Sequence, residues 1–197
     1  MTLSEIKRID VGKKRGPEFA GYTVPTLREF LDLMKEIGQQ MTFNFEFKDY
    51  IHVLGSEFAC KSADRAIALI DEYGFWDRSF ANSFDGGLLE YIEKKYDGRF
   101  RLHGFYPYEI IGNSKARLYC VCLLNRHLVD GKWVRSTSPV NPVEDFRRVK
   151  ADGIHPWVGQ NVRTETDVLC AVERGAELFT SDEPAALIEL LKKHGLR

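Results

Sequence analysis

The sequence lacks a long apolar run, closely spaced cysteine pairs of the metal-binding kind and any excess of charge of one sign. No apolar stretch approaches the ~20 residues that a membrane-spanning helix needs. With 28 basic and 29 acidic side chains, the formal net charge is −1, which argues against nucleic-acid binding as the main purpose. The first residues do not form the apolar segment of a signal peptide. We therefore expect a soluble, cytoplasmic protein with no membrane span and no nucleic-acid partner.

Cysteine is scarce as well, at four residues in 197. Cys60, Cys120, Cys122 and Cys170 form no Cys-x-x-Cys pair, and unpaired thiols fit a reducing compartment. Cys120 and Cys122 are two residues apart in the apolar run 118–124. Their side chains would therefore face the same side of a strand, as small buried hydrophobes.

Helical and strand patterns alternate along the chain. Apolar residues recur at helical spacing from Leu27 to Ile37, and Phe43–Lys48 alternates with the period of two typical of a strand. Further helices are predicted over residues 62–73, 88–95, 143–151, 164–174 and 184–194. Further strands are predicted over residues 79–84, 99–105, 115–124, 154–158 and 176–180, with a turn at 130–132. Such alternation indicates parallel strands joined by helical crossovers.

The parallel strands could form an open doubly wound sheet or a barrel. The sequence contains neither a dinucleotide-binding glycine fingerprint nor a P-loop. Its 197 residues are short for a (β/α)8 barrel, which typically has about 250. The difference corresponds to about two βα units.

The strand Phe43–Lys48 carries the best candidate for chemistry. Its phenylalanines would face the helices, and Asn44, Glu46 and Lys48 would then point into a barrel. Glu46 and Lys48 stand at the carboxyl end of the strand, where barrel active sites form. A carboxylate there can bind a hard divalent cation, and an ammonium can bind phosphate. The alternative is an internal ion pair that only fills the barrel.

Five segments, in chain order, resemble the glycerophosphodiester phosphodiesterase family. Residues 9–27 look like the approach to the third barrel strand of that family, and 44–48 resemble its Asn-Ile-Glu-Ile-Lys strand. Ser83-Phe84 resembles its Ser-Phe, and 157–161 its Trp-Thr-Val-Asn with a one-residue misfit. Residues 175–184 resemble its Gly-Val-Asp-Gly-Ile-Ile-Thr-Asp-x-Pro, with Ser181 inserted before the aspartate.

The resemblance implies a fold and a reaction. The fold is a partial TIM-type (β/α) barrel of the phospholipase-C-like phosphodiesterase type, with about six of eight parallel βα units. It would be one domain over residues 1–197 that lacks the first two barrel strands. The implied reaction converts a glycerophosphodiester and water into glycerol 3-phosphate and an alcohol, in lipid and glycerol metabolism, with one divalent cation, Mg²⁺ or Ca²⁺.

The resemblance also implies roles for four residues. Glu46 matches a metal carboxylate, Lys48 a possible phosphate contact, and Phe84 and Trp157 substrate-side positions. The family's His-Arg-Gly, Glu-x-Asp and His-Asp segments have no matching segment here, so the chain is expected to begin after them at an internal methionine. We therefore expect the cation to be weakly held or absent and the isolated chain to have little activity.

Other functions stay open. The chain could be a non-catalytic remnant that binds a phosphorylated ligand or a partner protein, or an unrelated open α/β sheet. The histidines are scattered, and His155 could enter a pocket at a strand end. A barrel without two strands would leave unpaired edges at 41–48 and 176–180. We therefore expect a homodimer, or an edge covered by residues 1–21 or by a partner.

Overall fold

The computed structural model describes residues 1–38, 40–159 and 161–197. The chain divides into two compact units, one of residues 1–42 and 64–78 and the other of residues 43–63 and 79–197. Helix α4 (Ser56–Glu72) contributes its first turns to the second unit and its remainder to the first. That the whole chain forms a single domain stays a prediction.

The first unit is mainly helical. It holds α1 (Leu3–Ile6), α2 (Leu27–Ile37) and the end of α4. A reciprocal capping box begins α2, in which the Thr26 hydroxyl accepts from the Glu29 N–H and the Glu29 carboxylate accepts from the Thr26 N–H. The Arg28 guanidinium on α2 donates to both carboxylate oxygens of Glu72 on α4, at 2.7 and 2.9 Å. The predicted bounds of α2 are confirmed.

The second unit is built on six parallel strands in the order β1-β2-β3-β4-β7-β8. The strands are β1 (Phe43–Glu46), β2 (Ser79–Asn82), β3 (Arg101–Tyr106), β4 (Leu118–Leu123), β7 (His155–Val158) and β8 (Leu178–Phe179). The crossover helices are α3 (Ile51–Leu54), α4, α5 (Gly86–Lys95), α6 (Val143–Ala151) and α7 (Glu165–Arg174), and α8 (Pro184–Lys193) follows the last strand. The prediction of six parallel strands alternating with helices is confirmed.

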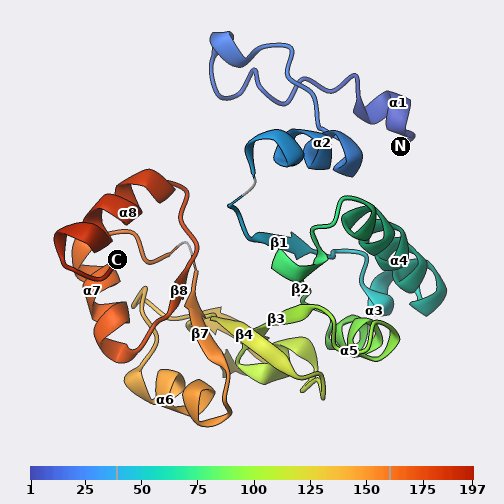
Figure 1. Cartoon of the computed structure of the whole chain (residues 1–197). Coiled ribbons are helices and arrows are strands. Elements are labelled where there is room, and N and C mark those ends of the chain that lie inside the picture. Colours follow the sequence, from blue (N-terminus) through green and yellow to red (C-terminus); the bar gives the residue numbers. More distant parts are fainter. Residues whose placement is uncertain (39, 160) are drawn as a thin grey trace. The chain divides into compact units, whose positions relative to one another are not determined.

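One face of this sheet is covered by helices. Val121, Leu123 and Val158 belong to a buried cluster with side chains of α6 and α7, and leucines of α8 pack against it. Phe146 on α6 is fully buried at its centre. Figure 1 shows α6, α7 and α8 on the same side of the curved sheet.

The opposite face is concave. Phe80 on β2 and Trp157 on β7 have ring centroids 6.1 Å apart, although β3 and β4 lie between their strands. In a flat sheet, three strand spacings would separate them by about 14 Å. The six strands therefore curl into a half-barrel, as predicted for a partial (β/α) barrel.

The cysteines follow their predicted burial. Cys120 and Cys122 are both buried on β4, and they pair with His155 and Trp157 of β7 on the concave face. Burial raises the pKa of the Cys122 thiol to about 12. These thiols therefore pack as small hydrophobic side chains.

The predicted turn at 130–132 is the tip of a hairpin that the sequence patterns did not indicate. Strands β5 (Arg126–Val129) and β6 (Lys132–Arg135) form a separate antiparallel pair. Asp130 and Gly131 both have positive φ, 47° and 74°, as a two-residue hairpin loop requires. Because four-residue strands carry few periods of alternation, only the turn was recognisable.

Helix α3 (Ile51–Leu54) was not predicted either, and other differences lie at element ends. Helix α4 begins at Ser56, six residues before the predicted start at Ser62, and β8 is limited to Leu178–Phe179. In the part of the chain that the structure describes, no helix combines the length and apolar character needed to cross a membrane.

Candidate functional site at the carboxyl rim of the half-barrel

The strand register places one set of polar and aromatic side chains on the concave face. Glu46 pairs with Asn82, Asn82 with His103, and His103 with Cys120. Residues that pair across parallel strands point to the same face. The side chains of Glu46, Asn82, His103 and Cys120 therefore all lie on the concave face.

Glu46 and Lys48 form the predicted pair at the end of β1. The Lys48 Nζ lies 3.2 Å from the Glu46 Oε2, and the Lys48 side chain is 68% exposed. The Phe47 N–H donates to the Asn82 carbonyl at 2.7 Å, which extends the pairing of β1 with β2 past Glu46. Because exposed ion pairs contribute at most about 1 kcal/mol, this pair can open when an anion approaches Lys48. The predicted pleat, with Phe43 buried and Glu46 on the concave face, is confirmed.

The Ser-Phe segment after β2 shapes the rim. The buried Ser83 hydroxyl donates to the Phe47 carbonyl at 2.9 Å and accepts from the Asp85 N–H at 3.0 Å. Ser83 therefore joins the segment after β1 to the segment after β2. Phe84 stacks on Phe105 of β3, with ring centroids 3.5 Å apart. Phe84 thus forms part of an aromatic wall, and its role toward a substrate stays a prediction.

Trp157 lies across the concave face. Its ring stacks on His103 at 4.4 Å, and its Nε1 donates to the Thr180 hydroxyl after β8 at 2.9 Å. These contacts connect β3, β7 and the chain beyond β8. Trp157 is therefore held in place as part of the concave wall of the half-barrel. Its contact with a ligand stays a prediction.

His103 is a buried neutral histidine. Its Nδ1 lies 3.3 Å from the Asn44 Oδ1, and its side chain is 3% exposed. Burial lowers the pKa of His103 to about 4. Within the described residues, neither its Nε2 nor the Asn82 Oδ1 has a hydrogen-bond partner. Sequence reasoning treated His103 as one of several scattered histidines, because its partners come from other strands.

His52 and Asp85 form a pair that sequence reasoning did not identify. The His52 Nδ1 lies 3.1 Å from the Asp85 Oδ2, and His52 stacks on Tyr50 at 5.4 Å. Asp85 also accepts from the Leu88 N–H as the N-cap of α5 and from the Ile51 N–H. Burial favours the neutral acid, but these hydrogen bonds outweigh it and lower the pKa of Asp85. An aspartate before Gly-Gly-Leu is an N-cap signal, whereas nothing in the sequence indicates its histidine partner.

His155 is at the amino end of β7, away from the carboxyl rim. Its Nδ1 lies 2.5 Å from the Glu177 Oε2. The other carboxylate oxygen of Glu177, Oε1, forms an ion pair with the Lys150 Nζ at 2.9 Å. Tyr119 packs against the His155 ring at 4.5 Å. His155 thus lies at a strand end, as expected, but at the end where β7 begins. Its entry into a pocket stays a prediction.

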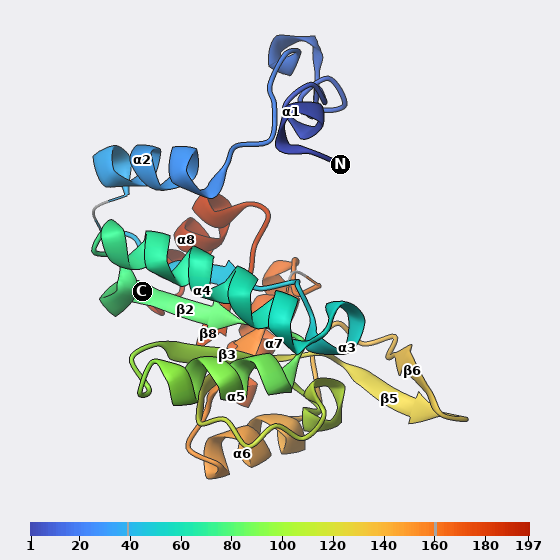
Figure 2. The ribbon, with the colours of Figure 1, turned by 90° about the vertical axis from the view of Figure 1, so that its right-hand side faces the viewer.

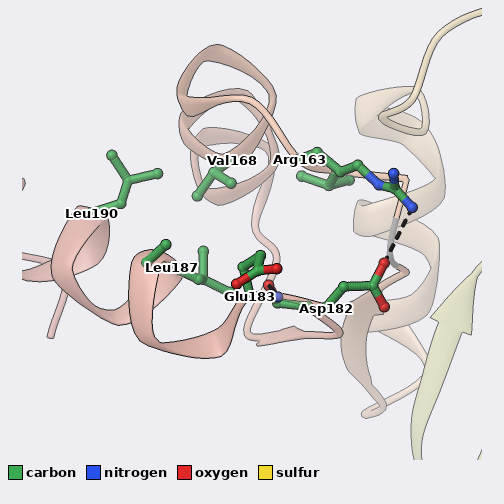
Figure 3. A pocket seen from close by; sticks show the side chains of 9 residues that line it. Arg163, Val168, Asp182, Glu183, Leu187 and Leu190 are labelled. Atoms are coloured by element: carbon green, nitrogen blue, oxygen red, sulfur yellow. Dashed lines mark hydrogen bonds and ion pairs between the residues drawn. The ribbon is translucent and has the colours of Figure 1, made fainter. Parts of the chain in front are cut away.

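A cavity of about 370 Å³ lies between α7 and α8 (Figure 3). Its walls are largely apolar, with Val168, Leu187 and Leu190 among them. The Arg163 guanidinium binds the Asp182 carboxylate at 3.2 Å where the cavity becomes polar. None of the four predicted site residues lines this cavity.

The carboxylates fit a divalent cation poorly. In the described parts of the chain, no three histidine, cysteine, aspartate or glutamate side chains form a group that could hold a metal ion. The carboxylate of Glu46 faces an ammonium instead. A Glu-x-Asp spacing does occur at Glu165 and Asp167, but Glu165 binds Lys193 and Asp167 binds Thr164 on the exposed surface of α7. Because Mg²⁺ and Ca²⁺ need several oxygen ligands, these residues by themselves support no metal-dependent step.

Comparisons with known proteins agree with this geometry. No protein-family profile matches the chain. A curated glycerophosphodiester phosphodiesterase of Caldanaerobacter subterraneus subsp. tengcongensis is 28% identical over 201 residues, covering 98% of this chain and 72% of the relative.

Solved structures with the same description share the fold. A glycerophosphodiester phosphodiesterase structure from Galdieria sulphuraria has a TM-score of 0.71 at 20% identity, covering 98% of this chain and 70% of that one. A glycerophosphoryl diester phosphodiesterase structure from Silicibacter pomeroyi has a TM-score of 0.74 at 18% identity, covering 100% and 69%. At these identities the structural likeness establishes the fold alone.

The curled sheet of parallel strands, with its polar and aromatic carboxyl rim, defines a (β/α)-barrel fold of the phosphodiesterase type. The sequence relationship runs along nearly the whole chain. The chain is thus similar in sequence to a glycerophosphodiester phosphodiesterase and shares the fold of solved structures described in that way. The alternative of an unrelated open sheet is thereby excluded.

Proposed function

We propose that the concave rim binds the phosphoryl group of a small glycerophosphodiester or another phosphorylated ligand, and that the isolated chain turns such a diester over slowly. The observation that carries the proposal is the exposed Lys48 ammonium beside Glu46, 3.2 Å from its carboxylate. An ammonium binds phosphate as a point charge, and its weak ion pair with Glu46 can be exchanged for the ligand. The aromatic wall of Phe84 and Trp157 would flank the organic part of the ligand.

The slow cleavage that we propose follows from the side chains available at the rim. Cleavage of a phosphodiester builds negative charge on the phosphoryl oxygens and on the leaving alkoxide. Lys48 can offset part of the first charge. A proton donor for the alkoxide contributes about 10²–10⁴-fold, and the sequence contains no His-Arg or His-Asp dipeptide matching the histidines of the family. A divalent cation, if it binds, would have Glu46 as a protein ligand and would supply charge neutralisation, with its remaining ligands coming from solvent or substrate.

A non-catalytic role in binding a phosphorylated ligand or a partner protein is the second candidate. The scarcity of grouped metal ligands among the described residues favours it. Either role is compatible with a cytoplasmic protein that acts in lipid and glycerol metabolism. Turnover dependent on Glu46 distinguishes the enzyme from the binding protein.

The experiment is a calorimetric titration of the whole chain with glycerol 3-phosphate. We expect measurable binding by the wild type, a loss of binding in Lys48→Ala and no change in Lys94→Ala, which removes an exposed lysine from the end of α5. No binding by the wild type, or equal loss in both variants, would remove the proposal. Release of glycerol 3-phosphate from glycerophosphocholine, measured with Mg²⁺ and then with Ca²⁺, decides between the two roles.

A further inference from the structure

The β5-β6 hairpin stands apart from the half-barrel sheet. It begins three residues after the end of β4, so it extends from the same carboxyl rim as the Glu46–Lys48 pair. Figure 2 shows the hairpin extending beyond the strands and helices of its unit. Seven of its eight strand residues are exposed, and Arg126 is half-buried. A two-stranded hairpin with both faces in water has little packing of its own to stabilise it.

The foot of the hairpin is nevertheless fixed to the core. The Asn125 side-chain amide donates to the Ser138 carbonyl at 2.8 Å and to the Val140 carbonyl at 3.1 Å. The Ser136 N–H donates to the Asn125 carbonyl at 2.8 Å. Val140 belongs to the buried cluster under α6 and α7. The hairpin therefore projects from the second unit while its base is anchored to the core by hydrogen bonds.

Apolar side chains occupy both faces of this projection. Leu128 pairs with Trp133 on one face, and Val129 and Val134 lie on the other. Leu128 is 59% exposed and Trp133 is 36% exposed. Exposed apolar groups gathered on one projecting element indicate a surface that is covered in use.

The same hairpin concentrates positive charge. Arg126, Lys132 and Arg135 have no ion-pair partner among the residues that the structure describes, and Asp130 is the one acidic residue between them. The whole chain, by contrast, has a net charge of −1. The partner of this surface should therefore be negatively charged and should accept apolar side chains.

We propose that the β5-β6 hairpin docks on an anionic phospholipid surface. Tryptophan prefers the interface between headgroups and acyl chains, and arginine and lysine beside it bind anionic headgroups. Each such cation strengthens the attachment about fivefold, which corresponds to about 1 kcal/mol. A nucleic acid would satisfy the charges but would leave Leu128, Val129 and Val134 in water.

A second copy of the chain fits this surface less well. In a two-fold contact, the same patch meets itself, so the unpaired cations of one copy would face those of the other. Like charges brought together in this way oppose association. The proposal is independent of the function proposed for Lys48, because docking requires no ligand at the rim.

The test is co-sedimentation of the full chain with vesicles of phosphatidylcholine, with and without phosphatidylserine. We expect binding only to the vesicles with phosphatidylserine, and weaker binding at higher salt. The triple variant Arg126→Gln/Lys132→Gln/Arg135→Gln should bind about a hundredfold more weakly. Trp133→Ser should bind about tenfold more weakly, because part of the ring surface no longer leaves water.

The matched control is Lys13→Gln/Lys14→Gln/Arg15→Gln, which removes three cations from the first unit. It should retain most of the binding. Equal losses in the two triple variants, equal binding to neutral vesicles, or no binding by a folded wild type would overturn the proposal. A hairpin variant that converts a dimer into a monomer in light scattering would instead assign the surface to a second copy, and would overturn it as well.

Discussion

The imidazole of His103 lies nearly parallel to the indole of Trp157, with ring centroids 4.4 Å apart and an angle of 10° between the planes. One ring comes from β3 and the other from β7, with β4 between them. The stack buries His103 and thereby depresses its pKa to about 4. The contact between His103 and Trp157 across the concave face therefore also makes the free energy of unfolding depend on pH.

The first prediction concerns that pH dependence. Between the ordinary pKa of 6.5 and the folded-state pKa of about 4, the unfolded chain binds a proton at His103 and the folded chain does not. Stability should therefore fall by roughly 3 kcal/mol as the pH decreases through this window. His103→Phe keeps an aromatic ring beside Trp157 and should flatten the dependence. Urea unfolding at about pH 7 and about pH 4.5 measures it.

An exposed histidine provides the control for His103. His127→Phe, on the hairpin, should leave the pH dependence of unfolding unchanged. If His103→Phe unfolds with the same dependence on pH as the wild type, His103 is not the group responsible.

The second prediction concerns turnover at the rim. The chain should release glycerol 3-phosphate from glycerophosphocholine at least about 10²-fold more slowly than the Caldanaerobacter relative, because its sequence has no His-Arg or His-Asp dipeptide to match the histidines of that family. Losses of several groups that act together are not additive, so the deficit should be smaller than the product of the separate effects. Comparison with the Caldanaerobacter relative under identical conditions measures it. Robust turnover that disappears in Glu46→Ala would contradict the prediction.

The third prediction concerns Asp85. Asp85→Ala removes the N-cap acceptor of the Leu88 N–H and the acceptor of the Ile51 N–H, and should destabilise the chain by about 2 kcal/mol. Asp85→Asn keeps an acceptor at the cap and should cost less. The lowered pKa of Asp85 adds a contribution that is present above its ordinary value of 3.8 and is lost as the pH falls through the folded-state value. Denaturant midpoints of the three proteins at neutral pH test the order, which equal values for Ala and Asn would refute.

The fourth prediction concerns the ends of the sheet. Strands β1 and β8 are the terminal strands of the six-stranded sheet, as the sequence led us to expect. Unpaired strand edges favour pairing with another chain. We expect a homodimer, or protection of these edges by residues 1–21 or by a partner. Light scattering gives the mass, and hydrogen exchange of the β1 and β8 amides shows whether the edges are protected. A monomer whose edge amides exchange freely would refute the expectation.

Several features could be predicted from short-range pattern. The helical spacing of Leu27–Ile37, its stop at Gly38 and the alternation from Phe43 onward depend only on neighbouring residues, and the structure has the corresponding helix and strand. The pleat of β1 also followed, because a strand that buries Phe43 must turn Glu46 to the other face. The hairpin strands did not follow, since they bury no face and so carry no alternation.

In the candidate site too, contacts between residues close in sequence were predictable and contacts between distant residues were not. The closeness of Glu46 and Lys48 was predictable, because residues two apart on a strand share a side. The pairing of His52 with Asp85 spans 33 residues, and that of His103 with Asn44 spans 59. Neither pair has a spacing that a local rule could detect.

Local patterns in the sequence therefore predicted the six parallel strands, most of the helices and the side of β1 that carries charge, because each depends on backbone geometry over a few residues. Long-range packing sets which histidine is buried beside Trp157, which histidine pairs with Asp85, and which apolar groups of β5 and β6 stay in water. Those outcomes depend on the curl of the sheet and on where the crossovers bring distant strands together, which no local pattern of residues encodes.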